Sequence, residues 1–244
     1  MSTTKSTNKT IAIFGAGTGL GASLAKRFGR GGYRVALVAR RAGPLEERVA
    51  ELAGAGIEAA AFPADITDIA AIPALVRAIE QRFGAIEIAV YQPVGHAGFV
   101  PAVDLDAAKL QPMANIFAFA PIEVSHAVLP GMLARGDGAI VIVGGLTAVV
   151  PIPGLSGVGP LMAAARNYVF TLNAEVKEKG VFAGTLNIGA VIENSAGFRA
   201  MTAGGVKLDP RYPILNPDDI AEELWTLVNR RDRVEAILPP LPAA

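Results

Sequence analysis

The chain contains no cysteine and only two histidines, His96 and His126, among its 244 residues. The absence of cysteine excludes disulfide bonds, a thiolate nucleophile and a zinc site with sulfur ligands. Two histidines are also too few for a histidine-rich metal centre, so no metal site is predicted. A chain without disulfides suits a reducing compartment, and a cytoplasmic location is expected.

Net charge is also absent, because 22 Lys and Arg residues balance 22 Asp and Glu residues. This balance gives no reason to expect nucleic acid or an anionic membrane as a partner. The most apolar stretches, 113–133 and 139–152, are interrupted by Gly, Pro or polar residues before about 18 apolar positions accumulate, so no membrane span is predicted. The polar residues 1–9 are expected to form a flexible tail and not a secretory signal.

Apolar residues, in contrast, are abundant. Hydrophobic residues make up 52% of the chain and charged residues 18%, and the mean hydropathy is +0.41. This composition excludes a disordered chain and requires a large buried core. Because no Ser-rich, Pro-rich or charged linker divides the sequence, residues 10–244 are predicted to form a single domain.

Short apolar runs alternate with longer amphipathic stretches along the whole chain. Strands connected by helices pair in parallel, and the crossover helices cover both faces of the sheet. The pattern predicts an α/β fold, a Rossmann-type doubly wound parallel sheet of about seven strands with helices on both faces. Strands are expected at 10–14, 33–39, 57–62, 86–91, 139–143, 181–187 and 234–238, and helices at 22–28, 43–54, 68–83, 102–135, 156–179 and 217–230. The Pro- and Gly-containing segment 188–216 interrupts this alternation and is expected to cover a substrate.

The first predicted strand is followed by glycines with the spacing Gly15-x-x-x-Gly19-x-Gly21 and then by a helix. Glycines at such a junction allow a tight turn and let the backbone approach a pyrophosphate, which the N–H groups and dipole of the helix N-terminus attract. The alternative is a turn without a ligand, but strand, spacing and helix together favour a dinucleotide site.

The segment from Phe14 to Gly21, Phe-Gly-Ala-Gly-Thr-Gly-Leu-Gly, resembles the first turn of the short-chain dehydrogenase/reductase family, with Phe14 in place of the usual threonine. Two further segments are similar to family elements: Ala64-Asp-Ile-Thr-Asp68, and Asn187-Ile-Gly-Ala-Val-Ile-Glu193. The resemblance implies a nicotinamide cofactor bound by Gly15, Gly17, Thr18, Gly19, Leu20, Gly21, Asp65, Ile66, Gly189 and Val191.

The second predicted strand ends in Ala39, which is followed by Arg40 and Arg41. Family members that use NAD typically carry an acidic residue there, which would repel the additional phosphate of NADP. Arginines instead grip that phosphate with charge-assisted hydrogen bonds, so NADP(H) is predicted as the cofactor. The alternative is a pair of solvated arginines without a ligand.

The family's catalytic serine, tyrosine and lysine are not found in this sequence. In the ungapped register from 138 to 176, their positions are occupied by Gly145, Val158 and Met162, none of which can donate a proton to a carbonyl. Asn115 matches the family asparagine that holds a proton-relay water. The other candidates for the acid or for a nicotinamide contact are His96, Tyr91 and Glu193, with Thr147 and Ser156 as less favoured hydroxyls, and Arg166 is a candidate for replacing the lysine's charge.

These features predict an atypical NADP(H)-dependent reductase of a small molecule with an activated C=C, C=N or carbonyl group. A catalytically inactive NADP(H)-binding module, acting as a redox sensor or supporting subunit, is the alternative, and a non-redox lyase or isomerase is less favoured because the glycine turn is intact. The resemblance also implies a homodimer or homotetramer with an interface at 102–135 and 156–179, where Glu123, Ser125 and His126 lie on the first helix.

Overall fold

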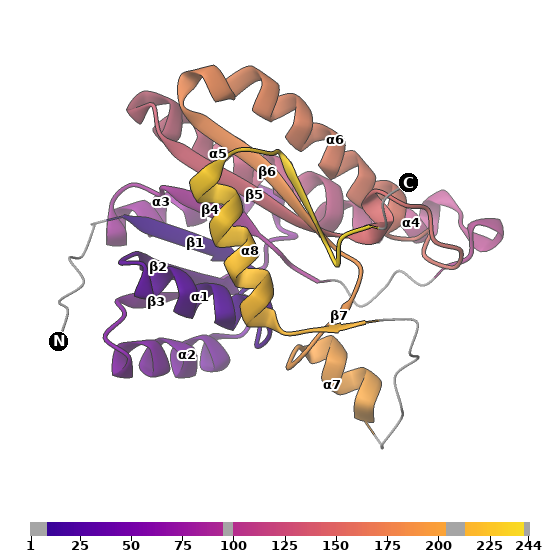
Figure 1. Cartoon of the computed structure of the whole chain (residues 1–244), viewed down its shortest axis with the longest axis horizontal. Coiled ribbons are helices and arrows are strands. Elements are labelled where there is room, and N and C mark those ends of the chain that lie inside the picture. Colours follow the sequence, from indigo (N-terminus) through magenta and orange to yellow (C-terminus); the bar gives the residue numbers. More distant parts are fainter. Residues whose placement is uncertain (1–8, 95–99, 204–212, 242–244) are drawn as a thin grey trace.

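The computed structural model describes residues 9–94, 100–203 and 213–241. Its centre is a seven-stranded sheet in the order β3-β2-β1-β4-β5-β6-β9, and every neighbouring pair is parallel (Figure 1). The predicted Rossmann-type sheet is therefore confirmed. The strands are β1 (Thr10–Phe14), β2 (Arg34–Ala39), β3 (Ala59–Pro63), β4 (Ile88–Tyr91), β5 (Gly138–Gly145), β6 (Val181–Ile188) and β9 (Glu235–Leu238).

Helices cover both faces of this sheet, because successive side chains of a buried strand point to opposite sides. In β1, Ile11 and Ile13 pack on one face, and Ala12 and Phe14 pack on the other. The first face carries α1 (Leu20–Arg30), α2 (Ala42–Gly54) and α8 (Pro217–Arg230). The second face carries α3 (Ile72–Phe83), α5 (Ala120–Arg135) and α6 (Gly159–Val176).

The predicted helix 102–135 is divided into several pieces. It contains a short 3₁₀ turn (Ala102–Asp104), α4 (Ala107–Ala114), a π-helical turn (Asn115–Phe119) and α5. The Ala120 N–H bonds the carbonyl of Asn115, one residue further back than in an α-helix. The widened turn directly precedes Pro121, which has no N–H to continue the α-helical pattern.

The segment 188–216 also has structure that the sequence did not predict. It contains β7 (Val191–Ile192), α7 (Ala196–Thr202) and β8 (Ile214–Leu215), and β7 pairs in parallel with β8. This unit contacts the turn that follows β1, where Ser195 packs on Gly19 and the Thr18 hydroxyl bonds the Asn194 carbonyl; β7 and α7 are labelled in Figure 1. It is therefore well placed to cover a site at that turn.

One helical stretch, Ala107–Arg135, is long and apolar enough to cross a membrane by length and composition alone, and it is the only one among the described residues. Its most apolar window is 44% buried inside the structure. Val124, Val128 and Met132 belong to the core beneath the sheet. Packing on the sheet thus accounts for part of the apolar character of this stretch.

Candidate functional site

The glycine turn between β1 and α1 is held in a conformation that needs glycine. Gly15 has φ = +92°, and a Cβ atom there would lie 2.7 Å from the backbone nitrogen of Pro93, which follows β4. The Gly15 and Ala16 amides both donate hydrogen bonds of 2.9 Å to the carbonyl of Val38 on β2. The turn is thus fixed between two neighbouring strands, at the point where the sheet order reverses between β1 and β4.

The middle of the turn is open. Gly17 is exposed, and a Cβ atom there would have only the Gly15 carbonyl oxygen within 4 Å, at 3.8 Å. Helix α1 begins at Leu20 without a side-chain cap and without an acidic residue in its first turn. The amides of Leu20 and Gly21 have no hydrogen-bond acceptor among the described residues. Free N–H groups at the positive end of a helix dipole beside open space fit the pyrophosphate of a dinucleotide.

Basic residues lie next to this turn, at the end of β2. Arg40 and Arg41 are exposed, and neither forms an ion pair with a described residue. Near them, Asp65 accepts hydrogen bonds from the Thr67 amide (3.0 Å) and hydroxyl (2.8 Å), which lower the pKa of its carboxyl group, with a smaller contribution from the Arg40 charge. Ile66, the next residue, is buried in the core.

The three positions that the family resemblance assigns to serine, tyrosine and lysine lie together at the end of β5 and the start of α6. The Gly145 N–H is 3.3 Å from the sulfur of Met162, and the Met162 amide bonds the Val158 carbonyl at 3.0 Å. The Thr147 hydroxyl also lies 3.7 Å from that sulfur. Glycine, valine and a thioether provide no acidic proton at this point of the sheet edge.

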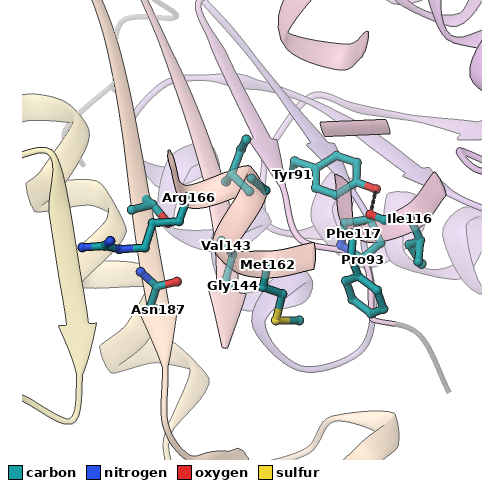
Figure 2. A pocket seen from close by; sticks show the side chains of 12 residues that line it. Tyr91, Pro93, Ile116, Phe117, Val143, Gly144, Met162, Arg166 and Asn187 are labelled. Carbon is teal, nitrogen blue, oxygen red and sulfur yellow. Dashed lines mark hydrogen bonds between the residues drawn. The ribbon is translucent and has the colours of Figure 1, made fainter. Parts of the chain in front are cut away.

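The side chain of Tyr91 is buried at the end of β4. Its side chain is 4% exposed, and its hydroxyl donates a hydrogen bond of 2.5 Å to the carbonyl of Ile116 (Figure 2). Burial raises the pKa of this phenol. In the described structure the Tyr91 proton is therefore engaged by a backbone carbonyl, and its transfer to a substrate would require that hydrogen bond to break.

The charge of Arg166 is neutralised by an ion pair in the described structure. Its guanidinium makes two hydrogen bonds, of 2.5 and 2.7 Å, to the carboxylate of Glu235 on β9. These bonds raise the pKa of Arg166 further. Asn187 donates to the same carboxylate at 2.7 Å, so the cluster ties α6, β6 and β9 together.

Beside this cluster lies a cavity of about 10 Å³, which has room for one water molecule (Figure 2). It is lined by Tyr91, Gly144, Met162, Arg166 and Asn187, among others. The Oδ1 atom of Asn187 is buried without a hydrogen-bond partner in the described structure. A Cβ atom on Gly144 would lie 2.6 Å from that oxygen, so glycine is required there to make room for it.

The remaining predicted site residues are distributed as follows. The Asn115 side-chain amide bonds the Thr67 carbonyl at 3.0 Å, which ties the π-helical turn to the loop of Asp65. Glu193 is exposed between β7 and α7, and its backbone amide bonds the Leu215 carbonyl. Gly189 packs against the side chain of Leu146, and Val191 forms part of β7. The Ser156 amide donates a hydrogen bond to the Val100 carbonyl. His96 lies outside the described residues.

A contact between α7 and the glycine turn was not indicated by any sequence pattern. Arg199 donates a hydrogen bond of 2.5 Å to the hydroxyl of Thr18, and that hydroxyl is 3.1 Å from the carbonyl oxygen of Asn194. Ser195 packs directly on Gly19, where a Cβ atom would lie 3.0 Å from the Ser195 Cβ. The partners are 176 or more residues apart, and no local pattern links them.

Known proteins share this fold and part of this sequence. A family model described as short chain dehydrogenase matches residues 9–197. A 2-(S)-hydroxypropyl-CoM dehydrogenase from Xanthobacter autotrophicus is 30% identical over 233 residues, which span 91% of this chain and 90% of that protein. A fatty acyl-CoA reductase from Mycobacterium tuberculosis is 34% identical over 136 residues, or 55% of this chain and 46% of that protein.

Two solved structures illustrate the likeness of the fold. A metagenomic short-chain oxidoreductase in complex with NADP has a TM-score of 0.79 at 22% identity, with 96% of this chain and 98% of that chain covered. A short-chain oxidoreductase from Pseudomonas aeruginosa PAO1, described as containing an atypical catalytic center, has a TM-score of 0.84 at 21% identity, with coverage of 97% and 98%. From the family match and the Xanthobacter relative, the chain belongs to the short-chain dehydrogenase family.

Proposed function

We propose that this protein binds NADP(H) at the glycine turn and reduces a small molecule that carries an activated C=C, C=N or carbonyl group. The observation that carries the proposal is the open turn at Gly17, beside the unpaired amides of α1 and the two arginines after β2. The first two features suit the pyrophosphate, and the arginines suit the ribose phosphate that distinguishes NADP from NAD. The NADP complex of the metagenomic fold neighbour agrees with this choice.

The bound cofactor supplies the hydride, and the chain has to hold the acceptor against it. The family positions of serine, tyrosine and lysine correspond in this proposal to Gly145, Val158 and Met162, so no phenol protonates the product. An acceptor whose reduction needs little acid assistance suits such a site. Asn115, through a relay water, and Glu193 are the proposed sources of the proton, and His96 remains a further candidate.

A second candidate is an NADP(H)-binding module without turnover. It is favoured by one observation: the nearest phenol, Tyr91, is bonded to a backbone carbonyl, and Met162 fills the space beside Gly145. The site as described then has no acid near β5. Both candidates share the cofactor, and they differ only in whether hydride leaves it.

A titration followed by a transfer experiment separates them. NADPH fluorescence is expected to show saturable binding, and 4-deuterated NADPH is expected to label at least one acceptor in a panel of enones, imines and quinones. Product deuterium is measured by mass spectrometry. Binding without any transfer favours the second candidate, and the absence of NADPH binding contradicts both.

Replacing Arg40 and Arg41 together by alanine is expected to weaken NADPH binding by about 10- to 100-fold and to leave NADH binding nearly unchanged. The lost charge-assisted hydrogen bonds serve only the ribose phosphate. Fluorescence titration with both nucleotides measures the two affinities. Arg30→Ala, an exposed arginine at the end of α1, is the control and should change neither. An equal loss for NADPH and NADH would refute the assignment.

We also propose that the protein is a homodimer or homotetramer assembled through α5 and α6, in a cytoplasmic location. Large apolar side chains remain exposed on or next to these helices: Phe119 is 54% exposed, Ile122 38% and Phe170 38%. Burial of such side chains against a second copy would remove apolar surface from water.

A further inference from the structure

We infer that Arg199 of α7 is a phosphate-binding residue that closes the β7–α7 segment over the pyrophosphate of the dinucleotide. This inference rests on the proposed function, and it concerns a residue that the family pattern does not identify. Its basis is the 2.5 Å hydrogen bond from the Arg199 guanidinium to the hydroxyl of Thr18, in the centre of the glycine turn.

The segment that carries Arg199 is attached directly to the turn. Ser195 caps α7 by accepting a hydrogen bond of 2.9 Å from the Phe198 amide, and the Arg199 amide bonds the Ser195 carbonyl at 3.1 Å. Ser195 itself rests on Gly19, which is buried beneath it. The position of Arg199 is therefore set by the same contacts that hold α7 on the turn.

The charges around Arg199 favour the binding of an anion. Arg199 is exposed, and no carboxylate among the described residues lies within ion-pair distance of it. It lies next to the N-terminus of α1, which is the positive end of a helix dipole and has no acidic residue in its first turn. Two positive features placed together are unfavourable unless a negative group lies between them. A diphosphate meets this requirement, and a guanidinium binds it with paired hydrogen bonds.

The pyrophosphate is favoured over the ribose phosphate by the location of Thr18. Thr18 directly precedes Gly19 and the unpaired amides of Leu20 and Gly21, which face the pyrophosphate in this proposal. The ribose phosphate is assigned to Arg40 and Arg41, which directly follow β2.

The test compares three ligands on purified full-length protein. Arg199→Ala is expected to weaken NADPH and NADH by a similar factor, about tenfold, because both contain the pyrophosphate. Adenosine 2′-monophosphate has no pyrophosphate and is expected to bind equally well to both proteins. Arg199→Gln keeps a hydrogen-bond donor for Thr18 but removes the charge, and it should lose affinity as Arg199→Ala does. Arg230→Ala, an exposed arginine at the end of α8, is the matched control.

The outcomes are distinguishable. Unchanged NADPH affinity in Arg199→Gln overturns the inference, because the guanidinium charge then has no role. A loss of affinity restricted to NADPH also overturns it, because Arg199 would then be assigned to the ribose phosphate. Failure of the unmodified protein to bind either nucleotide contradicts the proposed function instead. Thermal unfolding without ligand is expected to be the same for all variants, since α7 contributes no residue to the buried core.

Discussion

Replacement of Gly15 by alanine is expected to lower the free energy of unfolding by about 3 kcal/mol. The backbone at Gly15 has φ = +92°, where an L-residue is strained. The added carbon would also lie 2.7 Å from the backbone nitrogen of Pro93, which cannot rotate away as a side chain can. Urea or guanidinium denaturation with a shared m-value measures the change.

Gly17→Ala is the matched control for this variant. Gly17 does not lie in the left-handed region, and only one atom lies within 4 Å of the position that the alanine methyl group would take. Its free energy of unfolding is expected to change by less than about 1 kcal/mol. NADPH binding should nevertheless weaken, because the methyl group enters the space proposed for the pyrophosphate. Equal stability of Gly15→Ala and Gly17→Ala would contradict the strain argument.

The fold was predictable from the sequence because its signals are local. A strand buried on both faces shows as an apolar run such as Ile11–Phe14, and a crossover helix shows as an amphipathic stretch such as 72–83. The glycine turn is equally local, since Gly15 and Gly21 are needed for a turn that connects adjacent elements. Local sequence patterns were therefore sufficient to predict most of the sheet and the candidate cofactor site.

The side-chain partners in the site were not predictable in this way. Tyr91 bonds a carbonyl 25 residues away, Arg166 a carboxylate 69 residues away and Arg199 a hydroxyl 181 residues away. Which residue becomes the hydrogen-bond partner depends on how the helices pack on the sheet. Tyr91 and Arg166 are the right residue types for an acid and a lysine substitute, but packing directs both side chains elsewhere.

The π-helical turn before Pro121 is a backbone feature that was likewise not predictable from the sequence. Proline predicts a disturbance of the helix, but not whether the turn before it widens or breaks. Here it widens, and Asn115, the first residue of the widened turn, donates a hydrogen bond of 3.0 Å from its side-chain amide to the Thr67 carbonyl. The contact between this turn and the loop of Asp65 could not be predicted from the position of the proline alone.

The second large effect is expected from rebuilding the family's catalytic residues in the triple variant Gly145→Ser, Val158→Tyr and Met162→Lys. A serine fits, because Met162 is itself replaced in this variant, and the nearest remaining atom, the Thr147 hydroxyl oxygen, would lie 3.5 Å from a Cβ on Gly145. Positions 158 and 162 are one helical turn apart, so a tyrosine and a lysine placed there lie side by side. The lysine would replace a side chain of similar length and would lower the pKa of the new phenol.

NADPH-dependent reduction of simple ketones and aldehydes is expected to rise by about 100-fold over the unmodified protein, the lower end of what a positioned acid contributes. Steady-state kinetics measure kcat, and the control is the same triple variant with phenylalanine at position 158, which keeps the ring and lacks the proton. Equal rates for the two variants would show that the phenol does not act as the acid. If the tyrosine variant binds NADPH but gains no activity, Gly145, Val158 and Met162 do not occupy the catalytic positions. An activity gain with a rate that falls as pH rises through the pKa of the new phenol would place all three there, since only the protonated hydroxyl can donate to the carbonyl oxygen.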